Sequence, residues 1–128
     1  MLKYGLVASL IAVTATLNLA AAQSKKGANG GAVVVSSGHP IEFVTKGQDL
    51  TFYVSDDDGS PLQTKSVSGR ATVQEGGRTT TVPLQPAAPN MMVGKLQAPL
   101  GPKARVVFSA TFREGGHSHT LTARYVTD

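Results

Sequence analysis

The sequence predicts a single all-β domain built from about seven or eight short antiparallel strands. Three observations lead to this prediction. Short runs of alternating or β-branched apolar residues recur along the chain. Clusters of Gly, Pro, Asn and Asp, the residues that turns require, separate these runs. Finally, no stretch repeats its apolar residues with the 3.6-residue period of an amphipathic helix over a useful length.

Each expected strand is an apolar or alternating run that ends at turn residues. About seven or eight such strands in about 100 residues are typical of an immunoglobulin-like antiparallel sandwich, with a small barrel as the alternative. The antibody-type Cys and Trp are absent, so the pattern predicts the architecture alone. The expected strands span residues 32–36, 41–45, 50–55, 69–74, 79–84, 92–98, 104–113 and 118–126.

Alternation within these runs also predicts which side chains form the core, because successive strand residues point to opposite faces. The last two strands form a hairpin around Glu114-Gly115-Gly116, where glycine supplies the positive φ that a tight turn needs. The residues expected to point inward are Ile41, Phe43, Leu50, Phe52, Val54, Ala71, Val73, Val82, Leu84, Ala104, Val106, Phe108, Ala110, Phe112, Leu121, Ala123 and Tyr125.

The N-terminus carries the pattern of a bacterial signal peptide. Lys3 precedes an apolar stretch that ends in small residues, which predicts a signal peptide over residues 1–22, cleaved after Ala22. An uncleaved membrane anchor is the alternative, but polar residues within the stretch lower its hydrophobicity. Residues 23–31 are polar and glycine-rich and indicate a flexible leader, so the folded domain is expected over residues 32–128.

Composition narrows the partners and the chemistry. The chain has 12 Lys and Arg against 8 Asp and Glu and contains no Cys, which excludes disulfides, thiolate chemistry and lipoprotein acylation. Because the basic residues are scattered along the sequence and Trp is absent, nucleic acid is not expected as a partner. After cleavage of the signal peptide no membrane contact is expected either. The absence of every common catalytic motif indicates that the protein is not an enzyme.

The three histidines are the best candidates for a metal site. His117 and His119 stand two residues apart where the last expected strand begins, and in an extended chain both side chains project to one face, at the end of the sandwich. His39, expected in a loop beside Pro40, and Met91 are candidates to complete the site. Imidazole with thioether suits copper, whereas imidazole with carboxylate suits zinc, nickel or cobalt. The alternative is that His117 and His119 are merely polar residues of an exposed hairpin.

The run Asp56-Asp57-Asp58-Gly59 also offers carboxylates, which are ligands for calcium. It lacks the spaced positions and the distant Glu of an EF-hand loop. Since Asp-Gly followed by Ser-Pro is strong turn chemistry, we interpret this run as a structural turn.

Five segments of the chain form a recognisable set: GG (30–31), GHPIEF (38–43), LxFYVxDxDGxP (50–61), PxxPNxxxGxL (86–96) and GHSHTxxARY (116–125). Together they resemble small, largely uncharacterised periplasmic proteins and domains that accompany heavy-metal efflux systems of the resistance-nodulation-division type, some of them within the adaptor proteins. The resemblance implies a periplasmic location and histidines at His39, His117 and His119, whereas the histidine that often precedes the first Gly-Gly pair is Asn29 here.

Residues and resemblance together predict a periplasmic metal-handling domain linked to heavy-metal efflux. It would hold one copper ion, or one zinc, nickel or cobalt ion, and pass it to an envelope efflux protein. The alternative is a metal-free interaction module that docks on an envelope complex through a sheet edge or loop end.

Overall fold

The computed structural model describes residues 25–114 and 116–128, and these residues form nine antiparallel strands and no helix. The predicted signal peptide, residues 1–22, lies outside the described residues. Within this part of the chain there is no helix with the length and hydrophobicity needed to span a membrane. The all-β prediction is therefore confirmed.

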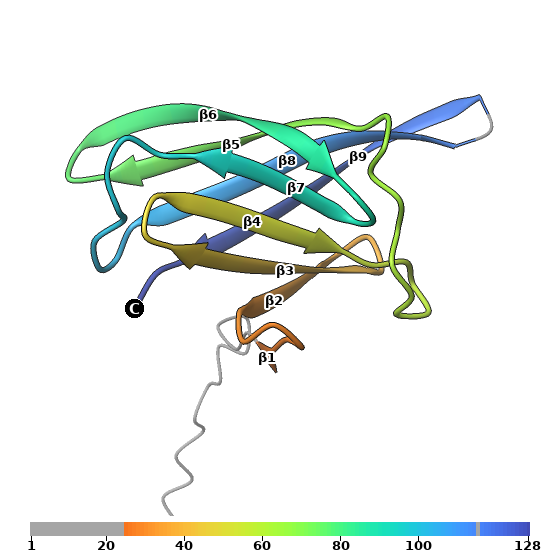
Figure 1. Cartoon of the computed structure of the whole chain (residues 1–128), viewed down its shortest axis with the longest axis horizontal. Coiled ribbons are helices and arrows are strands. Elements are labelled where there is room, and N and C mark those ends of the chain that lie inside the picture. Colours follow the sequence, from red (N-terminus) through yellow and green to blue (C-terminus); the bar gives the residue numbers. More distant parts are fainter. Residues whose placement is uncertain (1–24, 115) are drawn as a thin grey trace, which may run out of the picture.

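Most of the strands lie close to their predicted positions, and their connections are short except for the β4–β5 loop (55–67) and the β7–β8 connection (96–104), as Figure 1 shows. The strands are β1 (Lys25–Lys26), β2 (Ala32–Ser36), β3 (His39–Lys46), β4 (Asp49–Val54), β5 (Ser68–Glu75), β6 (Arg78–Ala87), β7 (Met91–Lys95), β8 (Arg105–Glu114) and β9 (His117–Val126).

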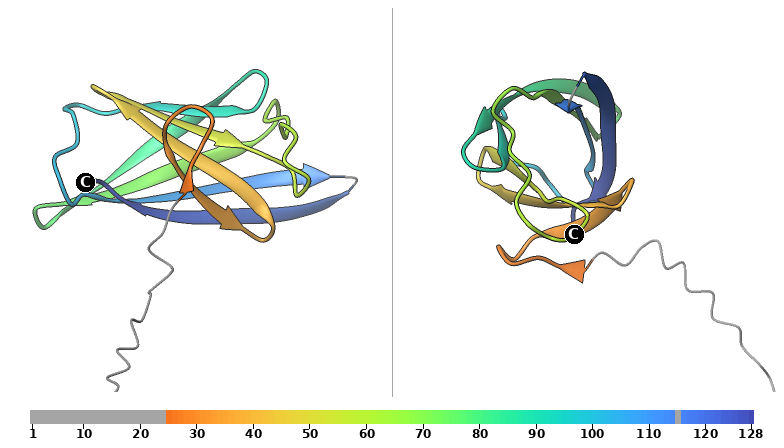
Figure 2. Two further views of the ribbon diagram at one scale, coloured as in Figure 1. Left: turned by 90° about the horizontal axis from the view of Figure 1, so that it is seen from below. Right: turned by 90° about the vertical axis from the view of Figure 1, so that its right-hand side faces the viewer.

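The nine strands form one sheet in the order β1-β2-β3-β4-β7-β6-β5-β8-β9. β6 joins the two parts of this sheet, because it pairs with β5 from Arg78 to Leu84 and with β7 from Gln85 to Ala87. The sheet curls into a half-barrel, and its strands surround a common centre in the end-on view of Figure 2. The immunoglobulin-like two-sheet sandwich is not confirmed, and the strand number exceeds the predicted seven or eight.

The two sides of the half-barrel approach each other at β2 and β9. Thr122 N on β9 donates a hydrogen bond to Ser36 Oγ on β2 (3.2 Å), although the two strands are not neighbours in the sheet order. Further inside, the Tyr125 hydroxyl donates to the carbonyl oxygen of Ile41 on β3 (2.6 Å). Burial of Tyr125, with a smaller contribution from the charge of Glu42, raises the pKa of this hydroxyl well above its ordinary value.

The concave face of the sheet carries the core, and every residue predicted to point inward is buried. Phe52 lies at its centre, with ring centroids 4.9 Å from Phe43, 4.6 Å from Phe108 and 6.0 Å from Tyr125. Each buried aromatic ring contributes about 1.5 to 3 kcal/mol of apolar burial. The contacts join β3, β4, β8 and β9, so this aromatic cluster holds the two sides of the half-barrel together.

Two local predictions differ from the structure. The described part of the predicted flexible leader, residues 25–31, forms β1 and a hydrogen-bonded turn from Gly27 to Gly31, because a buried carboxylate holds this segment, as described below. His39, predicted in a loop, is the first residue of β3. The two-residue turn before it consists of Ser37 and Gly38, both with positive φ (49° and 84°), as a tight hairpin turn requires.

Candidate functional site

The open end of the half-barrel gathers four connections: the β2–β3 hairpin, the loop after β4, the β6–β7 turn and the β8–β9 hairpin, which extends past the other strands in Figure 1. His39 shares the strand parity of the buried Ile41, and His119 shares that of the buried Leu121. Both histidines therefore lie on the concave face, one residue pair beyond the core.

The ring of His119 stacks with two other rings. Its centroid lies 6.0 Å from that of Phe112, its cross-strand partner on β8, with an interplanar angle of 18°. The centroid of His39 lies 5.9 Å from that of His119 at an interplanar angle of 23°. The structure thus brings together two of the predicted ligands, His39 and His119, from strands that are far apart in the sequence.

The hydrogen bonding of His39 determines which of its nitrogens is available. Nδ1 lies 3.1 Å from the carbonyl oxygen of Ser55. Because a carbonyl oxygen can only accept, Nδ1 carries the proton and Nε2 keeps its lone pair in the neutral ring. The carboxylate of Asp56 lies 4.0 Å from the same Nδ1. A partner on one ring nitrogen orients a histidine and raises the basicity of the other, as at many metal sites.

His119 has an unsatisfied ring nitrogen. Among the side chains of residues 25–113 and 116–128, its Nε2 is the only buried nitrogen or oxygen that has no hydrogen-bond partner. A buried polar atom left in this state costs about 1 to 3 kcal/mol. The site therefore contains an atom that would gain free energy from binding a ligand.

The other two predicted ligands do not join this pair. His117 stands two residues before His119 on β9, on the same strand face, but it is exposed at the tip of the hairpin. Met91 begins β7 with parity opposite to the buried Met92, opposite Tyr53 of β4. Its side chain therefore belongs to the convex face of the sheet, which excludes it from a site on the concave face.

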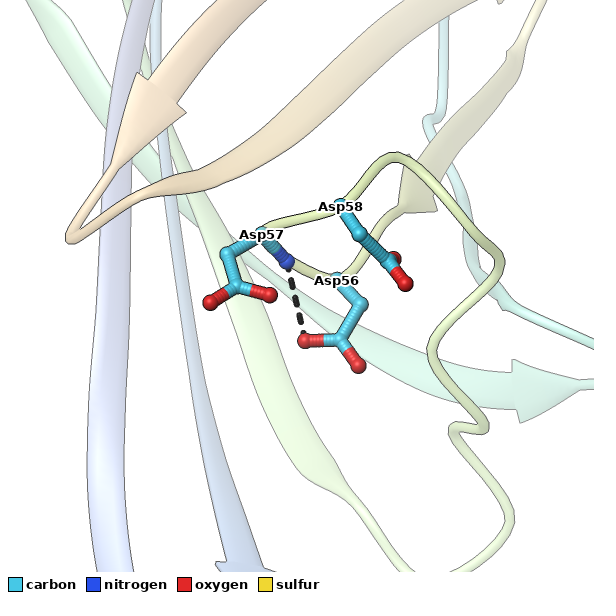
Figure 3. A group of neighbouring side chains, drawn as sticks. All are labelled: Asp56, Asp57 and Asp58. Carbon is cyan, nitrogen blue, oxygen red and sulfur yellow. Dashed lines mark hydrogen bonds between the residues drawn. The ribbon is translucent and has the colours of Figure 1, made fainter.

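Among the described residues, one group of three ionisable side chains has donor atoms within 4.8 Å of one another: Asp56, Asp57 and Asp58, shown in Figure 3. Asp56 Oδ1 accepts the amide of Asp57 (2.9 Å). Asp58 Oδ1 accepts both the hydroxyl and the amide of Ser60, which lowers the pKa of Asp58. These bonds are typical of a turn, as the sequence predicts, and nothing about the group itself indicates a metal.

Sequence reasoning missed a carboxylate that makes more hydrogen bonds than any other in the described part of the chain. Glu42 of β3 is only 6% exposed, although it points to the convex face. It accepts hydrogen bonds from the amide of Gly31 (2.7 Å) and from the amide and side-chain nitrogen of Asn29 (2.9 and 3.0 Å). A Cβ atom at Gly27 would overlap this carboxylate. The glycine-rich leader therefore forms a cradle for Glu42.

A signal for this cradle was present in the sequence. Gly27-Ala28-Asn29-Gly30-Gly31 contains the small residues that let successive backbone amides point to one anion. Glu42 lies at an outward position of an otherwise apolar strand. The glycine-rich segment does not indicate Glu42 as its partner, and Glu42 does not indicate the segment. The two meet only because the β2–β3 hairpin brings them together.

Comparison of the chain with protein-family models, curated proteins and solved structures gives no match. The chemistry that the open end can perform is therefore inferred from its residues alone. Two stacked imidazoles, one with a free Nε2 and one with an unsatisfied Nε2, form a donor pair suited to a borderline transition-metal ion.

Proposed function

We propose that this protein is an exported, periplasmic metal-handling domain that carries one transition-metal ion on His39 and His119 and delivers it to an envelope efflux partner. One observation carries the proposal: the unsatisfied, buried Nε2 of His119 beside the ring of His39. Export and periplasmic location rest on the signal-peptide pattern of residues 1–22 and on the sequence resemblance.

The separation of the two rings suits a shared ion. Imidazole nitrogens bind zinc at about 2.0 to 2.1 Å, so two rings on one ion have centroids about 5 to 6.5 Å apart, from tetrahedral to linear angles at the metal. The observed separation of 5.9 Å lies within this interval. To bind one ion, both side chains would have to be oriented with their Nε2 atoms directed at one point.

The available donors favour a borderline ion over a soft one. Met91 lies on the opposite face of the sheet, so no thioether completes the pair, and the Asp56 carboxylate lies beside Nδ1 of His39, the nitrogen that carries the proton, where it orients the ring. A pair of imidazole nitrogens suits Zn²⁺, Cu²⁺, Ni²⁺ or Co²⁺. Two protein ligands leave coordination positions open, which permits release to a partner. His117, exposed two residues away, is placed to meet an ion as it enters.

The immunoglobulin-like relationship remains part of this proposal. The division of β6 between β5 and β7 supports it, because it separates the strands into two groups on opposite sides of the core. Such a scaffold would present its loops and hairpins at one end, where His39 and His119 lie.

The direct test is a metal titration of the protein as it exists after cleavage, residues 23–128, with Zn²⁺, Cu²⁺ and Cu⁺, by calorimetry with a competing chelator. We expect one Zn²⁺ or Cu²⁺ site of micromolar or tighter affinity. Outer-shell partners alone are worth about 10- to 100-fold in metal affinity, so His39→Ala or His119→Ala should weaken binding about 100-fold.

Two matched variants serve as controls. His117→Ala removes an imidazole from the same hairpin, and Met91→Leu removes the thioether; both should leave the affinity within about threefold of the original protein. Binding that survives the double substitution His39→Ala with His119→Ala would contradict the proposal. So would a complete lack of binding by the original protein.

A further inference from the structure

The convex face of β5, β8 and β9 carries four exposed arginines that are widely separated in the sequence. Arg70 lies on β5, Arg105 and Arg113 on β8, and Arg124 on β9. In each strand the arginine positions alternate with buried positions, so all four arginine side chains belong to the convex face of the sheet. We name this surface, formed by Arg70, Arg105, Arg113 and Arg124 and the outward residues between them, the arginine face.

Strand register determines how the arginines are spread over this surface. Along β8, the outward positions run from Arg105 through Val107 to Ser109. Arg124 of β9 is paired with Val107, and Arg70 of β5 is paired with Ser109. With strands about 4.8 Å apart and outward positions about 7 Å apart along a strand, neighbouring guanidinium groups originate about 8 to 12 Å from each other. Arg113 extends the face toward the hairpin tip.

The residues between the arginines carry no negative charge. No outward position of β5, β8 or β9 in the described residues holds an Asp or a Glu. Two ion pairs are found in this part of the chain, and neither involves an arginine: His39 pairs with Asp56, and Lys95 pairs with Asp49. The outward positions are instead Ser68, Thr72, Gln74, Val107, Ser109, Thr111, Ser118, Thr120, Thr122 and Val126.

We propose that the arginine face docks this protein on a layer of anionic, phosphate-bearing lipid headgroups. Guanidinium groups bind phosphate oxygens in a bidentate way, and the intervening hydroxyls add further donors. The outward positions contain no aromatic residue, which a nucleic-acid strand needs for stacking and a protein interface uses as its anchor. A surface that offers charge and hydroxyls over three strands matches an extended anionic layer.

This docking leaves the histidine pair accessible. The arginine face is the convex side of β5, β8 and β9, whereas His39 and His119 lie on the concave side of the sheet. A protein held by its convex side would therefore keep the two histidines away from the headgroups. The sequence did not predict membrane contact after cleavage, because its arginines are dispersed along the chain and only the strand register collects them on one surface.

The test measures co-sedimentation of residues 23–128 with phosphatidylcholine vesicles, with and without about 30% phosphatidylglycerol. Each basic residue near an anionic membrane is worth about 1 kcal/mol, or about fivefold in partitioning, so Arg105→Gln with Arg124→Gln should weaken binding about 25-fold. The control Lys46→Gln with Lys95→Gln makes the same change of net charge on β3 and β7.

We expect binding only to the anionic vesicles, loss of binding in 1 M salt, and an affinity of the lysine control within about threefold of the original protein. All four substituted residues are exposed, and equal thermal stability of the variants will show that they fold. Equal weakening by both pairs would overturn the proposal, because net charge alone would then explain binding. Binding to neutral vesicles, or a stronger arginine-dependent affinity for a single-stranded oligonucleotide, would overturn it as well.

Discussion

Replacement of Glu42 by alanine tests whether the glycine-rich leader is held by a single buried carboxylate. The substitution removes the acceptor of the amides of Asn29 and Gly31 and of the Asn29 side chain. It leaves the apolar core unchanged, because Glu42 points to the convex face of β3. Any loss of stability therefore reports on the cradle.

The size of the effect follows from these contacts. A hydrogen bond to a charged group contributes about 1.5 to 3 kcal/mol, but Asn29 is exposed and its amides regain water when the carboxylate is lost. The amide of Gly31 is only partly exposed and regains less. We therefore expect Glu42→Ala to lower the free energy of unfolding by about 2 to 4 kcal/mol.

Urea denaturation followed by circular dichroism measures this loss, and hydrogen exchange locates it. The amides of Asn29 and Gly31 should lose protection in the variant. Asp49→Ala is the matched control, because Asp49 is an exposed carboxylate paired with exposed Lys95, and such pairs contribute about 0 to 1 kcal/mol. A Glu42→Ala protein as stable as Asp49→Ala, with Asn29 and Gly31 still protected, would refute the reasoning.

Three further substitutions test other parts of the fold. Gly27→Ala places a Cβ atom against the Glu42 carboxylate and should cost about 1 to 3 kcal/mol in urea denaturation. Thr64→Val removes a buried hydroxyl that donates to two backbone carbonyls (2.9 and 3.3 Å), with an expected loss of about 1 to 3 kcal/mol. Burial keeps the pKa of the Tyr125 hydroxyl above its value in the unfolded chain, which is near 10. The stabilisation that the neutral hydroxyl provides is therefore fully present below pH 10, and above it the free energy of unfolding falls by about 1.4 kcal/mol per pH unit. Tyr125→Phe should remove this fall and Tyr53→Phe should not; the opposite result would contradict the assignment.

The fold was predictable where local patterns decide the structure. Eight strands and most of the concave face follow from alternation, because a side chain's face depends only on its position within the strand. Alternation could not predict that β6 pairs with two different strands, or that the sheet curls as one unit, since both depend on contacts between distant segments. β1 has only two residues and carries no periodic signal.

The candidate site was predictable in its residues but not in its grouping. Parity correctly placed His119 and His117 on the concave face. The curl of the sheet, which parity does not predict, brings His39 and not His117 against the ring of His119. Met91 was a plausible ligand by chemistry and fails by parity, because Met92 takes the inward position. Glu42 lacked a visible partner because its partners are backbone amides, which a sequence does not display.

The most direct test of the central claim is a nitrogen-15 NMR spectrum of the histidine rings during a Zn²⁺ titration of residues 23–128. Our account predicts that the Nε2 signals of His39 and His119 shift together and reach their end point at one equivalent. His117 should respond less, because it lies outside the stacked pair. Unchanged signals of His39 and His119 after one equivalent of Zn²⁺, or a response confined to His117, would contradict a metal site at the open end of the half-barrel.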